Sequence, residues 1–189
     1  MAQLYGHFSG NGSFAIVSRA IARELKRQLP GSTAWSVQSY PAYEDSHLPT
    51  GLNNDARVGV LVGYPPGAEG ILAGHEFKVL VTVCEADPIP EDWVRTCNAM
   101  SLVVVPSGWC AGVFRKAGVR TEVLVAPHGI DRLDPINVPA PLVARYLHVT
   151  AAHSFPGRKG TPQLLAARAS AGLGMLELRT TPTPHMKPA

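Results

Sequence analysis

The chain has 189 residues, of which 46% are apolar and 16% are charged. This composition excludes a disordered chain, and the length predicts one domain, or one domain with a piece of a second. The net charge of +3, with basic residues spread along the sequence, does not indicate a nucleic-acid partner. No apolar run approaches the roughly 20 residues that cross a bilayer, and the opening MAQLYGHFSG lacks a signal pattern. We therefore expect a cytoplasmic protein without a membrane span.

Three cysteines, Cys84, Cys97 and Cys110, are widely spaced and include no Cys-x-x-Cys pair. An odd number of cysteines at this spacing suggests neither a disulfide framework nor a zinc site. We expect buried, reduced thiols, and the sequence indicates no metal requirement.

The first strand is predicted over residues 3–8, followed by a glycine-rich turn and a helix that extends to about Leu29. The helix is predicted from apolar residues at helical spacing: Phe14, Val17, Ile21, Leu25 and Leu29. A glycine-rich turn before a helix can present several backbone amides to an anion. Gly10, Asn11 and Gly12 are therefore candidates for contact with a phosphate or a sugar. The alternative is a tight turn whose glycines only let the helix and the strand pack closely.

The same turn also matches the dinucleotide-binding fingerprint, as Gly10-x-Gly12-x-x-Ala15. That kind of site needs an acidic residue at the end of the second strand to bind the ribose. The second strand is predicted over residues 33–38, and the sequence there continues as QSY without an acid. The sequence therefore disfavours NAD binding.

Two further strands are predicted in the middle of the chain, over residues 57–63 and 78–83, which are rich in small and β-branched residues. The connection between them is rich in glycine and proline and is expected to contain a short helix around Ile71. Residues 40–55, with two prolines and an Asn-Asn-Asp turn, are predicted to be a loop. Strands that alternate with such connections indicate an α/β protein.

Two carboxylates, Glu85 and Asp87, directly follow the strand over residues 78–83. Open parallel sheets bind their ligands at the carboxyl ends of the strands, so these side chains are candidates to accept hydrogen bonds from sugar hydroxyls. The alternative is that one of them caps the helix that is predicted to start near Pro90. Trp93 and Cys97, four residues apart, are expected on the buried face of that helix.

Residues 101–131 are predicted to form a βαβ unit with a loop at its end. Leu102 to Val105 form a short apolar run that is typical of a buried strand. Ser107 is expected to cap the next helix and Gly118 to end it. One face of this helix is expected to contain Trp109, Val113 and Phe114. A strand over residues 121–125 follows, and the chain leaves it through the sequence PHGID.

This pattern, VVVPS-x-W, then F-x-x-x-GV, then V-x-V-x-PHGID, resembles the end of the N-terminal domain of GT-B glycosyltransferases, specifically the retaining group called family 4. Three further stretches are similar to the same family, at residues 4–26, 84–94 and 153–167. The four motifs occur in the family's order and span most of the chain. The resemblance implies a Rossmann-like, open and mainly parallel sheet with helices on both faces.

The resemblance also implies an activity, which is the transfer of a sugar from a nucleotide sugar to an acceptor hydroxyl. The substrate would be a UDP- or GDP-sugar, and no cofactor is implied. Gly10, Asn11 and Gly12 would approach the donor sugar or its phosphates. Glu85 and Asp87 would be the catalytic carboxylates on the acceptor side.

Four more residues receive roles from the resemblance. His128 and Asp131, in the loop that closes the first domain, would lie at the cleft or the hinge. Arg158 and Lys159 would meet the diphosphate of the donor, where fixed cations stabilise the negative charge of the leaving group. For His128 the alternative is a structural histidine that backbone hydrogen bonds hold beside a glycine turn.

The expected domain organisation follows the same resemblance. Residues 1–131 would form the acceptor-side domain, and residues 132–142, with three prolines, the linker. Residues 143–180 would be a truncated start of the donor-binding domain, and residues 181–189 a disordered tail. Within this start we predict three elements: a strand over residues 146–150, a helix over 161–171 and a strand over 172–180.

Two classes of function remain open from the sequence. The chain is expected to be a truncated or split glycosyltransferase, which a homo-oligomer or a separate donor-domain partner would complete. The alternative is a non-catalytic ligand-binding or assembly subunit derived from the first domain of such an enzyme. The partners expected are a nucleotide sugar and an acceptor that the sequence does not identify.

Overall fold

The computed structural model describes residues 1–8, 12–37, 51–129, 145–150, 160–172 and 175–180. The chain divides into two compact units, residues 1–131 and 132–189, and each is described by itself. None of the helices within these described ranges is long and apolar enough to cross a membrane.

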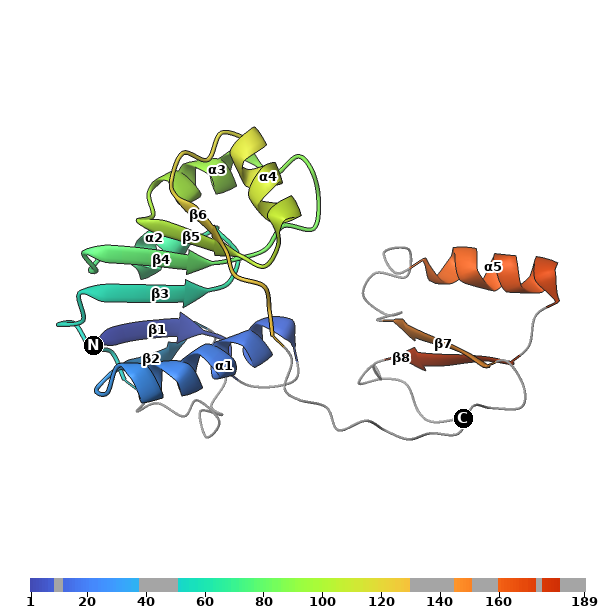
Figure 1. Cartoon of the computed structure of the whole chain (residues 1–189), viewed down its shortest axis with the longest axis horizontal. Coiled ribbons are helices and arrows are strands. Elements are labelled where there is room, and N and C mark those ends of the chain that lie inside the picture. The colour runs from blue at the N-terminus through green and yellow to red at the C-terminus, as the bar shows by residue number, and fades with distance from the viewer. Residues whose placement is uncertain (9–11, 38–50, 130–144, 151–159, 173–174, 181–189) are drawn as a thin grey trace. The chain divides into compact units, whose positions relative to one another are not determined.

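The first unit is built on a six-stranded, all-parallel sheet with the strand order β2-β1-β3-β4-β5-β6 (Figure 1). The strands are β1 (Ala2–Gly6), β2 (Thr33–Ser36), β3 (Val58–Val62), β4 (Phe77–Val81), β5 (Leu102–Val105) and β6 (Val123–Val125). This confirms the predicted α/β class with an open, Rossmann-like parallel sheet. The strand order reverses between β1 and β3, and such a reversal marks the point where open sheets bind ligands.

Helices cover both faces of this sheet, as predicted. They are α1 (Ser13–Gln28), α2 (Ala68–Ile71), α3 (Glu91–Asn98) and α4 (Gly108–Lys116). Side chains of α1 pack against one apolar cluster of the sheet, and side chains of α2, α3 and α4 belong to the other. The helices that connect the strands therefore lie on opposite faces of the sheet, with α1 on one face and α2, α3 and α4 on the other.

The strand register explains how the two apolar clusters are separated. Leu4 lies beside Val60, and Tyr5 lies beside Leu61. Successive side chains of a strand point to opposite faces. The Leu4 pair therefore packs with the α1 cluster, and the Tyr5 pair packs with the larger cluster.

Helix α4 begins and ends where its sequence predicts. The Ser107 hydroxyl accepts a hydrogen bond from the backbone N–H of Cys110 at 3.2 Å, and Gly118 has the left-handed φ of +104° beyond the end of the helix. Both confirm the predicted cap and stop. Phe114 is fully buried, whereas Trp109, which was predicted on the same face of the helix, is 56% exposed. Trp109 lies in the first turn, just past the carboxyl end of β5, where the sheet offers little surface to pack on.

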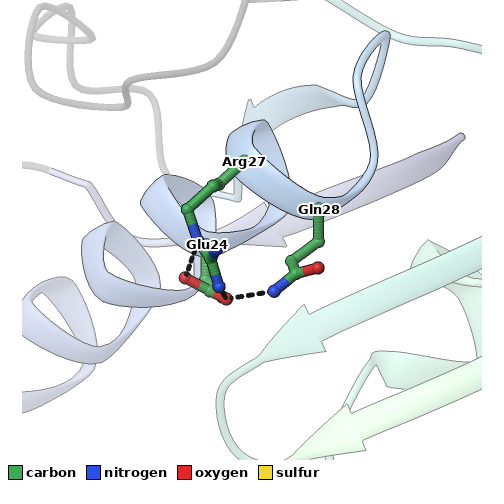
Figure 2. A network of polar contacts seen from close by, with 3 residues as sticks. All are labelled: Glu24, Arg27 and Gln28. Atoms are coloured by element: carbon green, nitrogen blue, oxygen red, sulfur yellow. Dashed lines mark hydrogen bonds and ion pairs between the residues drawn. The ribbon is translucent and has the colours of Figure 1, made fainter.

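The exposed end of α1 contains a polar network of Glu24, Arg27 and Gln28 (Figure 2). Arg27 Nε donates to Glu24 Oε2 at 3.1 Å, and Gln28 Nε2 donates to Oε1 at 2.8 Å. These hydrogen bonds, that of Arg27 first, lower the pKa of Glu24 to about 2. Residues three and four positions apart are neighbours on a helix, which explains the network without any tertiary contact.

A chain of buried polar groups connects Tyr5 of β1 to the amino edge of the sheet, where His75 precedes β4. The Tyr5 hydroxyl lies 2.9 Å from His75 Nε2, and His75 Nδ1 lies 2.7 Å from the carbonyl oxygen of Ala56. Because a carbonyl only accepts, Nδ1 carries the proton, and Nε2 accepts from the tyrosine. The His75 side chain is 6% exposed, and a Cβ atom on Gly59 would lie 2.3 Å from its ring.

The second unit contains β7 (Arg145–Thr150), α5 (Thr161–Ala171) and β8 (Met175–Thr180). The strand, helix and strand occur in the predicted order. Strands β7 and β8 pair in parallel as a two-stranded sheet of their own. This makes the unit a single βαβ element.

Candidate functional site

Aromatic rings gather at the carboxyl ends of β1 and β3, beside the reversal of strand order. Phe14 in the first turn of α1 meets Tyr64 edge-on, with ring centroids 4.9 Å apart at 85°. Tyr64, which follows β3, lies 5.5 Å from Trp93 of α3. His7, after β1, lies 6.4 Å from Phe14 at the other end of the row. The four rings therefore connect the ends of two strands to two helices.

A pocket of about 360 Å³ opens beside the last two rings of this row. Its wall combines the rings of Tyr64 and Trp93 with the segment between β4 and α3. The lining residues are Tyr64, Cys84, Glu85, Ala86, Pro88, Ile89, Pro90 and Trp93. Most of these are apolar, and Tyr64 is 46% exposed. We call this the aromatic pocket.

The two predicted carboxylates have different surroundings. Glu85 lines the aromatic pocket, whereas Asp87 does not. Asp87 Oδ2 instead forms an ion pair with Lys116 Nζ at 2.9 Å, at the end of α4. The structure thus places one of the two candidate carboxylates in the pocket and pairs the other with a lysine.

The start of α3 corrects two of our expectations. Its N-cap is Pro90, with no side-chain cap, so the alternative that Glu85 or Asp87 caps this helix is wrong. Cys97 is fully buried as expected, but Trp93 is only partly buried and lines the aromatic pocket. The helical spacing could not show this, because it does not reveal that the ring of Trp93 lies beside Tyr64 as well as against the larger apolar cluster.

The three thiols are free and buried, as predicted. Burial, with a contribution from the Cys110 thiol, raises the pKa of Cys84 to about 12, and burial raises the pKa of Cys97 to about 12. Cys110 Sγ donates to the carbonyl oxygen of Cys84 at 3.6 Å. A thiol with so high a pKa stays protonated at neutral pH and is a poor nucleophile, so Cys84 contributes an apolar wall to the pocket.

The glycine-rich turn is only partly described, because Gly10 and Asn11 lie outside the described residues. Gly12 is the N-cap of α1 with an ordinary φ of −66°, and a Cβ atom there would meet nothing within 4 Å. Close packing therefore does not require this glycine. The tight contact of strand and helix is instead at Gly6, where a Cβ atom would lie 2.5 Å from Ser18 Oγ. Our sequence analysis missed Gly6, whose signal was a glycine in the predicted strand itself.

A second pocket, of about 510 Å³, lies between α1 and the end of β6. It brings Ser13, the residue after Gly12, together with His128 of the Pro-His-Gly loop. Its other lining residues are mostly apolar: Ile16, Val17, Ala20, Ile21, Val81, Val104, Val105, Ala126, Pro127 and Gly129. We call this the loop pocket.

His128 lies in the loop after β6, and its side chain is exposed. Within the described part of the chain it has no hydrogen-bond partner, so the backbone bonds expected of a structural histidine are absent there. Three other candidates, Asp131, Arg158 and Lys159, lie outside the described residues. Of the residues predicted for the donor side and for the cleft or hinge, the structure describes Gly12 and His128, and the loop pocket lies between His128 and Ser13, the neighbour of Gly12.

The described residues contain no group of three His, Cys, Asp or Glu side chains that could hold a metal ion.

A scan of the chain against models of protein families finds no match, and a search of curated proteins finds no relative.

Proposed function

We propose that the chain provides the acceptor-side domain of a glycosyltransferase, which transfers a sugar from a UDP- or GDP-sugar to an acceptor hydroxyl. The observation that carries this proposal is the loop pocket. Ser13 and His128 are 115 positions apart, yet both line it. The glycine-rich turn and the Pro-His-Gly loop are the two motifs that, in the resembled family, face the same cleft.

The reaction sets requirements for each pocket. The acceptor oxygen forms a bond to the anomeric carbon of the sugar, the bond from that carbon to the diphosphate breaks, and the nucleoside diphosphate leaves with the electron pair. The proton of the acceptor hydroxyl passes to a base. A carboxylate at the acceptor can take this proton, and we assign this role to Glu85, which lines the aromatic pocket.

On the donor side, the proposal assigns the loop pocket to the nucleotide sugar. Backbone amides in the first turn of α1 have no partners within the helix and stabilise nearby negative charge. The first turn contains no acidic residue that would oppose an anion. His128 at the rim supplies a hydrogen-bond donor, and Arg158 and Lys159 remain the proposed contacts of the diphosphate.

The test is a titration of the full chain with UDP- and GDP-sugars, followed by thermal unfolding and by release of nucleoside diphosphate. We expect saturable stabilisation by one nucleotide class, weakened in His128→Ala and in Arg158→Ala. Trp109→Ala serves as a control, because Trp109 is exposed and lines neither pocket. A chain that no UDP- or GDP-sugar stabilises would contradict the proposal.

A second candidate is a non-catalytic ligand-binding or assembly subunit. The Asp87–Lys116 ion pair favours it, because this pair occupies one of the two carboxylates expected at a catalytic acceptor site. The same titration separates the two functions. Saturable binding with no release of nucleoside diphosphate, with a range of acceptors present, would support the binding subunit and contradict transfer.

A further inference from the structure

The aromatic pocket has a composition that restricts its ligand. Two rings, two prolines and the side chains of Cys84, Ala86 and Ile89 form apolar walls. Glu85 is the charged residue that lines it in the described part of the chain. Ligand pockets usually combine apolar walls with a few placed polar groups, which fix the orientation of the ligand.

The rings of this pocket are held in place before any ligand binds. Phe14 contacts Tyr64 edge-on at 4.9 Å, and Trp93 lies beside Tyr64 at 5.5 Å. Both distances are in the range of favourable aromatic pairs. A side chain that is already ordered loses little conformational entropy on binding, which favours affinity. The exposed part of Tyr64 is therefore a prepared surface for a flat ring.

The size of the pocket limits the ligand to one or two rings. Its volume of about 360 Å³ is near the lower end of the roughly 300–1,000 Å³ that is common for ligand sites. A long chain or an oligosaccharide would extend outside it, with most of its surface in water.

The shortage of polar partners argues against a fully hydroxylated sugar as the occupant. A hexose brings several hydroxyl groups, and each one that is buried without a partner loses its hydrogen bonds to water. Apart from Glu85, the tyrosine hydroxyl and the indole N–H are the polar side-chain groups of the described lining. A ring with one hydroxyl group avoids this loss.

The charge of Glu85 disfavours an anion in the pocket. A carboxylate or a phosphate beside Glu85 would face a like charge, which weakens binding. A carboxylate has about four lone-pair positions, so Glu85 retains acceptor capacity for a ligand hydroxyl in addition to its interactions within the protein.

We propose that the aromatic pocket binds the acceptor and that the acceptor is a neutral phenol or aromatic alcohol. Its ring stacks against Tyr64 and Trp93, and its hydroxyl donates a hydrogen bond to Glu85. That the ligand is the acceptor of a sugar rests on the proposed function, whereas the chemical class of the ligand follows from the pocket alone.

The test measures binding to the full chain without any nucleotide sugar, by saturation-transfer NMR of three probes. They are 4-methylphenol, the anion 4-hydroxybenzoate and methyl α-glucoside. We expect 4-methylphenol to bind, 4-hydroxybenzoate to bind at least about tenfold more weakly because of Glu85, and the glucoside to give no signal. Glu85→Gln should reduce the difference between the two phenols.

Variants locate the binding. Tyr64→Ala should lower the affinity for 4-methylphenol by about tenfold, the loss expected for one stacking ring. Trp109→Ala should leave this affinity unchanged. If Tyr64→Ala proves unfolded, Tyr64→Leu retains a large apolar side chain at this position and removes the aromatic ring with its hydroxyl. Equal binding of the glucoside and the phenol, or equal affinity in the Tyr64 and Trp109 variants, would overturn the inference. Because no donor is present, failure here leaves the nucleotide-sugar titration as an independent test of the proposed function.

Discussion

Two sets of tyrosine and histidine side chains in the first unit have opposite surroundings. Tyr5 of β1 is buried, its hydroxyl reaches the buried His75 at the amino edge of the sheet, and every nitrogen of the His75 ring has a partner. At the carboxyl edge, Tyr64 and His128 are exposed and line pockets. Polar side chains that satisfy one another stabilise a fold, and polar side chains turned to a pocket are left for a ligand. The same residue types thus serve stability at one edge and, in our proposal, binding at the other.

The largest effect that we predict is at Gly59. Alanine there would place Cβ 2.3 Å from the His75 ring, which hydrogen bonds on both sides prevent from moving. We expect Gly59→Ala to lower the free energy of unfolding by about 3 kcal/mol, as for overpacked cores. Urea unfolding measures it.

Gly112→Ala is the matched control for this substitution. Gly112 lies inside α4, and a Cβ atom there would meet nothing within 4 Å. Alanine is favoured over glycine in a helix, so this variant should be more stable by about 0.5–1 kcal/mol. A loss of stability at Gly112 as large as that at Gly59 would contradict the role given to the buried histidine.

The next effect separates the two edges directly, because the same substitution is made at each. Tyr5→Phe removes the hydroxyl that His75 Nε2 accepts from, and leaves a buried acceptor unpaired. We expect a loss of about 1–3 kcal/mol. Tyr64→Phe at the exposed carboxyl edge should change the unfolding free energy by less than about 0.5 kcal/mol. Equal losses in urea unfolding would remove the contrast between the edges.

A smaller effect is expected at the Asp87–Lys116 ion pair. The Lys116 side chain is 74% exposed, and the Asp87 side chain is 35% exposed. Solvent and salt screen such pairs, so Asp87→Asn should cost less than about 1 kcal/mol. The measurement is a double-mutant cycle with Lys116→Met at low and high salt. A coupling that is large and insensitive to salt would show that the pair is more than a surface contact.

The smallest effect is expected at Glu24, which lies on the exposed face of α1 (Figure 2). Arg27 and Gln28 lower its pKa from 4.5 to about 2 in the folded protein. The stabilisation is therefore present above pH 4.5 and is lost as the pH falls through this window toward 2. In the Glu24→Gln variant, the free energy of unfolding should no longer show this part of its dependence on pH. NMR titration of the Glu24 carboxyl measures the pKa directly, and an unshifted value would contradict the network.

Local signals made much of the first unit predictable. The strand–helix–strand unit that ends in the Pro-His-Gly loop was predicted from an apolar run, the Ser107 cap and the Gly118 stop. Each of these acts over a few residues, so the sequence around it contains the necessary information. The short helix α2 and the burial of Cys97 were predicted for the same reason.

The pockets were less predictable, because side chains far apart in sequence form them. Ser13 and His128, which line the loop pocket, are 115 positions apart, and Tyr64 and Trp93, which line the aromatic pocket, are 29 apart. No spacing rule links such positions. Tyr64 was not singled out from the sequence, since a tyrosine in a loop gains its role only from the rings that pack beside it.

The contrast between the edges is tested most directly by a ¹⁵N-NMR map of the full chain titrated with 4-methylphenol. We predict that the largest amide shifts fall at Tyr64 and at residues 84–93, around the aromatic pocket. Residues 55–58 and 75–77, at the amino edge, should stay unshifted. Largest shifts at the amino edge, or no shifts at either edge, would contradict the assignment of ligand binding to the carboxyl edge.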